Sequence, residues 1–286
     1  MERVPPRCEN TEVSTTADQE RRFYDDQYSR FLDLPDHALA IDRAILLRTI
    51  HDPRQPAFER RRLYTLALDR LTKEPLAHIR ALEYGCGTAD WGLWMASEGA
   101  EVALVDLSPV AIEVALRRAR AGGVVQRVGG FARDAADLSC FESAHFDLVL
   151  ASAALHHTLK YPGAYRELLR VLKPGGRLYL IETYGNNPVL NAARRLRAWM
   201  ARESADQGEG IILGDADLAL LRRDFTRVEL VPVNLLAMTK RLFRGRFTNP
   251  AIRVAVAALE ALDRTLLALA PSLRKYCGEL LVIATK

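Results

Sequence analysis

Short apolar runs alternate with amphipathic stretches through most of the chain. Most of these runs end at a glycine, an aspartate or a polar turn, as buried strands do. The run at 146–152 is almost continuously apolar, which is typical of a strand covered on both faces. We therefore predict strands at 77–84, 101–106, 124–134, 146–152, 177–183, 226–233 and 278–285.

Helical spacing fills the segments between these runs. The clearest start signal is Ser108 followed by Pro109, because serine caps a helix and proline suits its first position. Strands that alternate with helices of this length indicate βαβ units. The expected fold is therefore α/β, with a mostly parallel sheet and helices on both faces. The predicted helices are 90–97, 109–122, 162–172, 190–203, 215–223 and 250–270.

The first quarter of the chain has a different pattern. Residues 1–17 are polar and are expected to form a mobile tail. Residues 18–74 read as two or three helices, broken near Leu34-Pro35 and Asp52-Pro53, with no strand signal. We predict an N-terminal helical cap over 18–74 and a core domain over 75–286, with a helical insertion at about 240–271.

Composition adds only broad limits. Hydrophobic residues make up 49% of the 286 residues, enough for a sizeable core, and the net charge is +4. That charge does not indicate nucleic-acid binding, which usually shows as a basic patch. The four cysteines have neither CxxC nor metal-ligand spacing, so we expect free thiols and no metal site. No signal peptide or membrane span is apparent, and a cytoplasmic location is expected.

The candidate cofactor motif lies at 82–90, where the first predicted core strand turns into a helix. Gly85 and Gly87 let ligand atoms approach the backbone, and a helix N-terminus suits an anionic group. Asp106 ends the next strand, where its carboxylate could accept from a ribose diol. These features fit a dinucleotide site equally well. Three features favour a cofactor other than a dinucleotide. They are Glu83 within the strand, Asp90 where the GxGxxG motif of dinucleotide sites has its third glycine, and a final strand that comes late in the chain.

As a set, five segments resemble class I S-adenosylmethionine (SAM)-dependent methyltransferases. Residues 82–90 resemble the first motif of that family, with Ala89 where its third glycine stands, and 146–157 resembles the fourth. Residues 106–107, 134–135 and 170–176 resemble the ribose, adenine and pre-strand-5 segments. The resemblance implies a Rossmann-like, seven-stranded, mostly parallel sheet whose last strand is antiparallel. It also implies SAM as cofactor and S-adenosylhomocysteine as product.

The same resemblance implies roles for individual residues. The backbone of the glycine turn would face the methionine part of SAM, Glu83 would orient its ammonium or a nearby water, and Asp106 would hold the ribose hydroxyls. Asp134 would accept from the adenine amine, or would simply be a turn residue. The implied cofactor-binding residues are Glu83, Gly85, Cys86, Gly87, Asp106, Leu107, Asp134, Ala135 and Ala151.

Other residues are candidates for catalysis or acceptor binding. His156 and His157 follow the fourth strand and could act as a general base, or could bond the next helix or face solvent. Tyr24 and Tyr28 could form a lid over SAM or could pack the cap onto the core. Glu182 and Asn186 could hydrogen-bond an acceptor, although Asn-Asn-Pro is equally a turn; the candidates are His156, His157, Tyr24, Tyr28, Glu182 and Asn186.

The predicted helix 250–270 carries an apolar stripe at helical spacing and follows four basic residues. We interpret the stripe as core or a dimer seam, with an acceptor site or an interfacial membrane helix as alternatives. The basic residues are expected to form a solvated face or to meet an anionic acceptor group. The stripe is Ile252, Val256, Leu259, Leu262, Leu266 and Leu269, and the basic residues are Lys240, Arg241, Arg244 and Arg246.

The predicted function is methyl transfer to O, N or C of a small, fairly hydrophobic metabolite, such as a lipid, quinone, polyketide or alkaloid. Residues 151–154 bear no Asp/Asn-Pro-Pro-aromatic motif, which argues against nucleobase amines as acceptors. An RNA methyltransferase and a SAM-binding protein without methyl transfer remain as alternatives. A nucleic-acid partner is not expected, whereas a homodimer and a peripheral membrane contact stay open.

Overall fold

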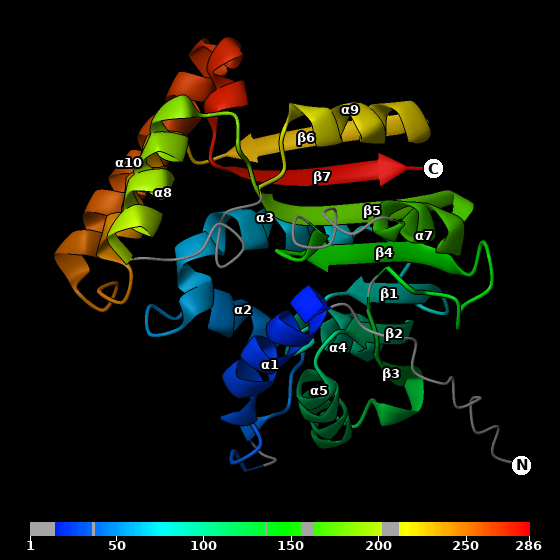
Figure 1. The fold of residues 1–286 in the computed structure, drawn as a ribbon. Helices are drawn as coiled ribbons and strands as arrows, with labels where there is room; N and C mark the ends of the chain where they lie inside the picture. Colours follow the sequence, from blue (N-terminus) through cyan, green and yellow to red (C-terminus); the bar gives the residue numbers. More distant parts are fainter. Residues whose placement is uncertain (1–14, 36–37, 135, 156–162, 202–211) are drawn as a thin grey trace, which may run out of the picture.

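A single seven-stranded sheet organises the chain in the computed structural model, which describes residues 15–35, 38–134, 136–155, 163–201 and 212–286. The strand order is β3-β2-β1-β4-β5-β7-β6 (Figure 1). Strands β1 to β5 pair in parallel, and β7 runs antiparallel to both neighbours, β5 and β6. The predicted fold class, with its late-inserted antiparallel strand, is confirmed. The strands are β1 (Arg80–Tyr84), β2 (Glu101–Asp106), β3 (Val128–Ala132), β4 (Phe146–Ser152), β5 (Leu172–Thr183), β6 (Arg227–Val233) and β7 (Glu279–Thr285).

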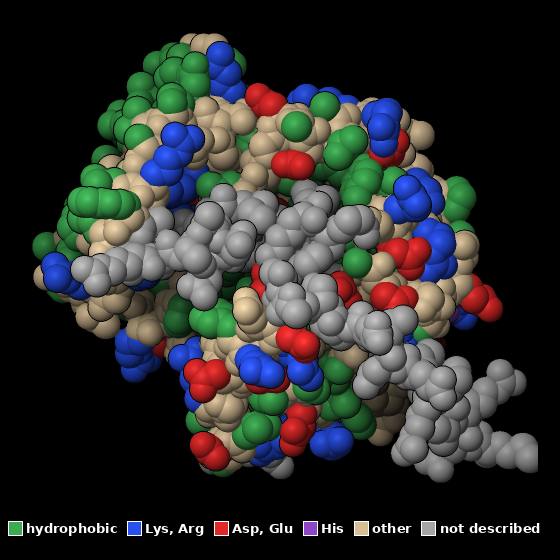
Figure 2. Space-filling view, in the orientation of Figure 1, with side chains coloured by type: hydrophobic (Ala, Val, Ile, Leu, Met, Phe, Trp, Pro, Cys, Tyr) green, Lys and Arg blue, Asp and Glu red, His purple; other side chains and the backbone are tan. Residues whose placement is uncertain are grey.

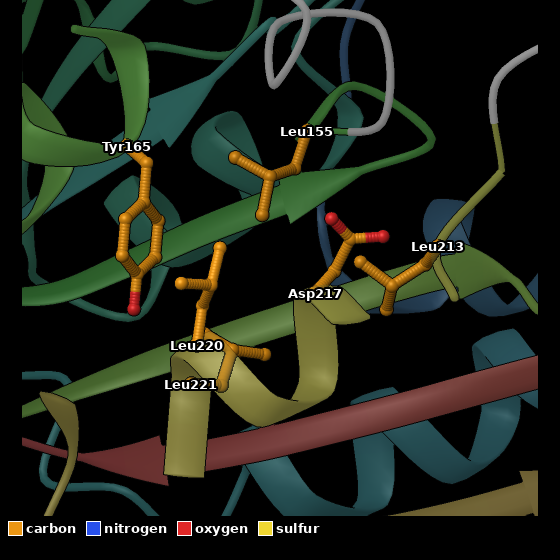
Figure 3. A pocket seen from close by; sticks show the side chains of 6 residues that line it. All are labelled: Leu155, Tyr165, Leu213, Asp217, Leu220 and Leu221. Atoms are coloured by element: carbon orange, nitrogen blue, oxygen red, sulfur yellow. The ribbon is translucent and has the colours of Figure 1, made fainter. Parts of the chain in front are cut away.

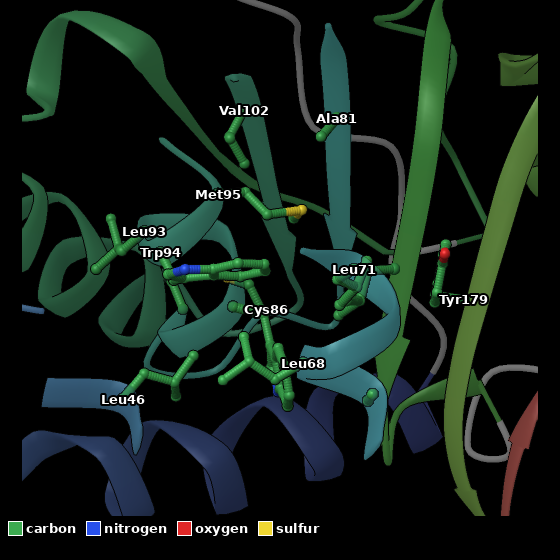
Figure 4. Packing of buried hydrophobic residues seen from close by; sticks show 14 of the residues in the cluster. Leu46, Leu68, Leu71, Ala81, Cys86, Leu93, Trp94, Met95, Val102 and Tyr179 are labelled. Carbon is green, nitrogen blue, oxygen red and sulfur yellow. The ribbon is translucent and has the colours of Figure 1, made fainter. Parts of the chain in front are cut away.

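Helices cover both faces of this sheet. Trp94 and Met95 of α4 pack with cap residues such as Leu71 on one face (Figure 4). On the other face, Leu168 of α7 and Leu221 of α9 join the second hydrophobic cluster. The helices are α1 (Thr15–Ser29), α2 (Arg43–His51), η2 (Pro56–Arg60), α3 (Arg61–Leu71), α4 (Asp90–Ser97), α5 (Pro109–Ala121), η3 (Val125–Arg127), α7 (Ala164–Val171), α8 (Pro188–Ala201), α9 (Asp215–Asp224), η4 (Leu236–Phe243), α10 (Pro250–Leu269) and η5 (Pro271–Tyr276).

Some predicted boundaries need correction. Helix α1 begins at Thr15, so the last three residues of the predicted tail are helical, and Ala17 is fully buried. The predicted strand at 124–134 is shorter, because η3 precedes β3. Strand β5 begins at Leu172 rather than at Arg177, because Leu172 pairs with Phe146 across a register shift. A local turn signal at Pro174-Gly175 cannot show that the flanking residues are already paired.

The insertion between β6 and β7 corrects two further expectations. Helix α10 turns Val256, Glu260, Asp263 and Leu267 toward the protein. Leu262 and Leu269, two members of the predicted apolar stripe, are exposed. The inward carboxylates have partners: Glu260 bonds Arg61 at 2.7 Å, and Asp263 accepts backbone N–H groups of residues 235–237.

The predicted solvated basic face is also wrong in part. Lys240 is fully buried, and its Nζ lies 3.1 Å from Oε2 of Glu279. Arg244 donates to both carboxylate oxygens of Glu59 on η2, at 2.7 and 3.0 Å. These basic side chains therefore join the insertion to the cap and the sheet. Within the described residues, none of the helices combines the length and apolar character needed to cross a bilayer.

Candidate cofactor site

The turn between β1 and α4 is built from left-handed residues. Gly85, Gly87 and Ala89 have φ values of 66°, 50° and 60°. The N–H groups of Gly85 and Cys86 donate to the carbonyl of Val105, at 2.8 and 3.0 Å, which holds the turn against β2. A Cβ on Gly85 would lie 2.4 Å from Cβ of Ala154, so that position requires glycine. Ala89, which departs from the family pattern, accepts the left-handed conformation at the helix start.

Asp106 connects this turn to the next helix. Its Oδ2 accepts the N–H of Gly87 at 2.8 Å, and its Oδ1 accepts the N–H of Ser108 at 2.9 Å. Burial raises the pKa of this carboxyl, while the two backbone N–H bonds act in the opposite direction. Each carboxylate oxygen accepts more than one hydrogen bond in general, so ribose hydroxyls can still be bound. Leu107 is half-buried beside it.

Glu83 lies beneath the turn. It is 3% exposed, and its Oε2 accepts the N–H of Gly92 in α4 at 2.7 Å. Burial raises the pKa of this carboxyl to about 8. A Cβ on Gly92 would come within 2.6 Å of that oxygen, so Gly92 is a site residue that the motif search missed. Its signal was a glycine inside a predicted helix. The role of Glu83 toward an ammonium group stays a prediction.

Helix α1 of the cap rests on the site. The hydroxyl of Tyr28 lies 2.6 Å from the position that a Cβ on Gly87 would take. The ring of Tyr24 stacks on the ring of Tyr28, with 6.1 Å between the ring centroids. Burial raises the pKa of both phenols, that of Tyr24 to about 12, and Asp106 raises both further. The hydroxyl of Ser108 donates to Asp25 at 2.5 Å, which ties α1 to α5. Sequence reasoning missed this link, because 83 residues separate its partners.

The structure places the remaining predicted residues as follows. Ala151 is fully buried in β4, paired with Tyr84 and Leu180. Asp134 accepts the N–H of Ala136 at 2.8 Å, as a turn residue does, and its bond to adenine stays a prediction. Ala135, His156 and His157 lie outside the described residues.

Glu182 and Asn186 both have partners within the protein. Glu182 is fully buried, and its Oε1 accepts the N–H groups of Ala154 and Leu155 at 3.2 and 3.0 Å. It therefore holds the backbone that follows β4, next to Gly85. The amide of Asn186 donates to the Tyr184 hydroxyl at 2.6 Å. Binding of an acceptor by either side chain stays a prediction.

A buried charged cluster lies at the same edge of the sheet and was not predicted. Its centre is Glu279 at the start of β7, fully buried, which faces Lys240 at 3.1 Å and Arg60 at 3.8 Å. The Asn234 amide also donates to Glu279, and Arg60 donates to the hydroxyl of Thr183 at 3.5 Å. Burial raises the pKa of Glu279, but the two cations outweigh this and hold it below its usual value.

A small apolar pocket is lined by residues that do not belong to the glycine turn (Figure 3). Its lining comes from the segment after β4, from α7, and from α9 with the residues before it. Asp217, its one charged member, accepts the N–H of Gly214 at 2.8 Å. None of the residues predicted to bind the cofactor lines this pocket, which is formed by Leu155, Tyr165, Leu213, Asp217, Leu220 and Leu221.

Comparisons with known proteins agree with this geometry. Residues 81–176 match the family model described as a methyltransferase domain. The chain is 37% identical to the demethylmenaquinone methyltransferase of Staphylococcus saprophyticus over 107 residues, which cover 36% of this chain and 44% of that protein. It is 33% identical to a ubiquinone biosynthesis O-methyltransferase of Methylocella silvestris over 118 residues, 41% of this chain and 45% of that one. The chain spans about half the length of the curated relatives it matches.

Two solved structures share the fold over nearly the whole chain. The [4+2]-cyclase SpnF superposes with a TM-score of 0.55 at 22% identity, covering 96% of this chain and 97% of that one. The geranyl diphosphate C-methyltransferase of Streptomyces coelicolor gives a TM-score of 0.56 at 16% identity, covering 96% and 98%. Together with the match of residues 81–176 to the methyltransferase-domain model, these likenesses confirm the predicted Rossmann-like fold. These two likenesses show the fold alone, because the sequence identities are only 22% and 16% and one fold can serve different activities.

Proposed function

We propose that the protein is a methyltransferase that transfers the methyl group of SAM to O, N or C of a small, fairly hydrophobic metabolite. The observation that carries this proposal is the bridge from Asp106 to Gly87 and Ser108. It holds a carboxylate at the tip of β2 beside a left-handed glycine turn, where a ribose diol and an amino-acid group can both be bound. The similarity to quinone-biosynthesis methyltransferases supports a hydrophobic acceptor.

The residues of the turn fit SAM. When bound, SAM supplies an activated methyl group on its sulfonium. Gly85 and Gly87 would let its methionine part contact the backbone, and Asp106 would hold the ribose hydroxyls. Tyr24 and Tyr28 would exclude water from above, because α1 already rests on the turn. Alignment of donor and acceptor can contribute about 7–11 kcal/mol to lowering the barrier.

The acceptor would approach from the carboxyl edge of the sheet. Glu182 positions the backbone after β4, and a general base there, for which His156 and His157 are the candidates, would take a proton from an O or N acceptor. A cytoplasmic location, a homodimer and a membrane contact belong to the proposal too. RNA methylation and SAM binding without transfer are its alternatives.

Calorimetry with SAM and S-adenosylhomocysteine tests the cofactor. Both should bind to the folded protein, and Asp106→Ala should weaken binding by roughly tenfold or more, because a charge-assisted hydrogen bond contributes about 1.5–3 kcal/mol. Glu101→Ala, an exposed carboxylate at the opposite end of β2, is the matched control and should leave SAM binding unchanged. Heat of binding from a nicotinamide dinucleotide, with none from SAM, would overturn the assignment.

Incubation with labelled SAM and a metabolite extract, followed by mass spectrometry of the labelled product, tests the reaction. A labelled apolar metabolite is expected, and His156→Ala should slow its formation while SAM still binds. Labelled RNA instead would favour the first alternative. SAM binding with no S-adenosylhomocysteine formed would favour the second.

A further inference from the structure

Helices α8 and α10 both have an inverted arrangement of side chains. In α8, the polar Asn191 and Arg194 turn inward, where they bond the carbonyls of Gly185 and Tyr184 at 2.6 and 3.5 Å. The outward stripe of α8 is apolar and includes Val189, Leu196 and Trp199, which are 73%, 55% and 77% exposed. A helix on the surface of a soluble domain normally turns its polar face to water.

Helix α10 shows the same inversion. Its two carboxylates, Glu260 and Asp263, are buried against the protein. Val254, Leu262 and Leu269 face outward and are 71%, 46% and 79% exposed. The exposed positions between them are mostly alanine. Figure 2 shows hydrophobic side chains gathered at the end of the molecule where α8 and α10 lie in Figure 1. We call the outward sides of α8 and α10 the apolar end face.

Charge indicates what covers the apolar end face. The stretches 188–201 and 236–278 hold only two acidic residues, Glu260 and Asp263, and both are buried. The exposed basic residues that the structure describes in these stretches outnumber the two carboxylates, and they are Arg195, Arg244, Arg246, Arg264, Arg274 and Lys275. A second copy would bring like charges together across a two-fold axis. Apolar residues with an exposed tryptophan, flanked by arginine and lysine, suit a surface of anionic lipid.

The position of the apolar end face fits that partner. The arrowheads of β4 and β5 point toward the end of the molecule occupied by α8 and α10 (Figure 1). The side chain of Asn187, just before α8, donates to the carbonyl of Tyr276 at 2.8 Å, so the start of α8 is fixed to the segment that follows α10. The apolar end face therefore lies at the carboxyl edge of the parallel strands, where ligands enter an open α/β sheet.

We propose that the apolar end face docks onto an anionic phospholipid surface, so that an acceptor dissolved in the lipid reaches the carboxyl edge directly. The delivery of the acceptor rests on the proposed methyl transfer, whereas the docking does not. Trp91 and Trp94 are buried, which leaves Trp199 as the exposed tryptophan among the three of the chain. Its emission therefore reports contact with lipid.

The test is co-sedimentation with vesicles of phosphatidylcholine alone or mixed equally with phosphatidylglycerol. The protein should bind the mixed vesicles, with a blue shift of Trp199 emission, and added salt should release it. Arg195→Glu should weaken binding about tenfold, because each basic residue near an anionic surface contributes about 1 kcal/mol and the reversal adds repulsion. Leu196→Asp should weaken it at least as much. Arg120→Glu on α5 and Leu34→Asp, both away from the apolar end face, are the matched controls.

Two results would overturn the docking. One is the absence of binding and of any emission change with the mixed vesicles. The other is a dimer in light scattering that Leu196→Asp separates, with no vesicle binding, since the apolar end face would then be a self-interface. Calorimetry with SAM on the same preparations separates the proposals. Binding of SAM without vesicle binding overturns only the docking, and vesicle binding without SAM binding overturns only the cofactor assignment.

Discussion

The two ends of the sheet are held together in different ways. Around the glycine turn, Glu83 bonds Gly92 nine residues away, and Asp106 bonds Gly87 and Ser108, 19 and two residues away. At the β5–β7 end, Arg244 meets Glu59 across 185 residues and Arg61 meets Glu260 across 199. The glycine turn itself is thus held by backbone N–H groups and carboxylates close along the chain, and α1 is added to it through the bond of Asp25 with Ser108 across 83 residues. The other end depends on paired charges from distant segments, and that difference can be measured.

The largest effect is expected at the buried charged cluster. Lys240→Met leaves Glu279 fully buried, with Arg60 and Asn234 as its remaining polar partners among the residues that the structure describes. The free energy of unfolding should therefore fall by about 3–5 kcal/mol. Urea denaturation measures this change. Lys173→Met is the control, because its pair with Asp147 is 36% exposed on both sides and should contribute only about 0–1 kcal/mol. Equal losses for the two variants would contradict the buried-pair interpretation.

The next largest effect is expected at Glu83, beneath the glycine turn, and it concerns how stability changes with pH. The folded pKa of Glu83 is raised from 4.5 to about 8, so folded protein keeps a proton that unfolded protein has released. The stability that this group contributes is fully present below its unfolded pKa of 4.5 and is lost as the pH rises toward its folded pKa of about 8. The difference corresponds to about 5 kcal/mol. Glu83→Gln should therefore flatten the dependence of the unfolding free energy on pH between pH 4.5 and about pH 8.

A control distinguishes that slope from a general effect of carboxylates. The pKa of Glu167 is lowered by its hydrogen bonds with Arg170, so this residue contributes no slope at neutral pH. Glu167→Gln should leave the pH dependence of the parent unchanged there. A parent whose stability does not fall with rising pH would show that Glu83 is ionised in the folded state.

A smaller effect is expected at the glycine turn. Gly87→Ala puts a Cβ on a residue whose backbone is left-handed, which reduces stability by about 1–2 kcal/mol. The new methyl group also displaces the Tyr28 hydroxyl. Gly123→Ala has the same strain with no atom within 4 Å, so the excess loss at Gly87, about 1 kcal/mol or more, measures the contact with α1. Unfolding in urea gives both values. If Tyr28→Phe in the Gly87→Ala background removes none of the excess, the hydroxyl is not the obstacle.

The smallest effect concerns the link between cap and core. Ser108→Ala removes the N-cap of α5 and the bond to Asp25, which together should reduce stability by about 2 kcal/mol. Asn249→Ala removes only a cap, that of α10, and should reduce it by about 1 kcal/mol. Thermal unfolding of the two variants compares them. A loss at Ser108 no larger than that at Asn249 would show that the Asp25 bond contributes nothing.

The features that could be predicted from the sequence are mostly those held by contacts close along the chain, as around the glycine turn. The strands and the positions of α4, β2 and β4 were predictable, because each depends on hydrophobic spacing and caps within a few residues, whereas the antiparallel last strand was implied only by the resemblance to methyltransferases. The glycine turn and Asp106 were predictable for the same reason. The apolar stripe of α10 was wrong at Leu262 and Leu269, because periodicity reveals a helix but not which of its faces meets the protein.

The tertiary structure alone decided the rest. Lys240 belongs to a basic cluster along the chain, and only the packing of η4 against β7 turns it into the buried partner of Glu279. Glu260 and Asp263 lie outside the predicted apolar stripe, yet both are buried, because Arg61 and the backbone N–H groups of residues 235–237 bond them. The physical reason is that burying a charge requires a partner, and for these residues the partner comes from a segment that local sequence does not specify.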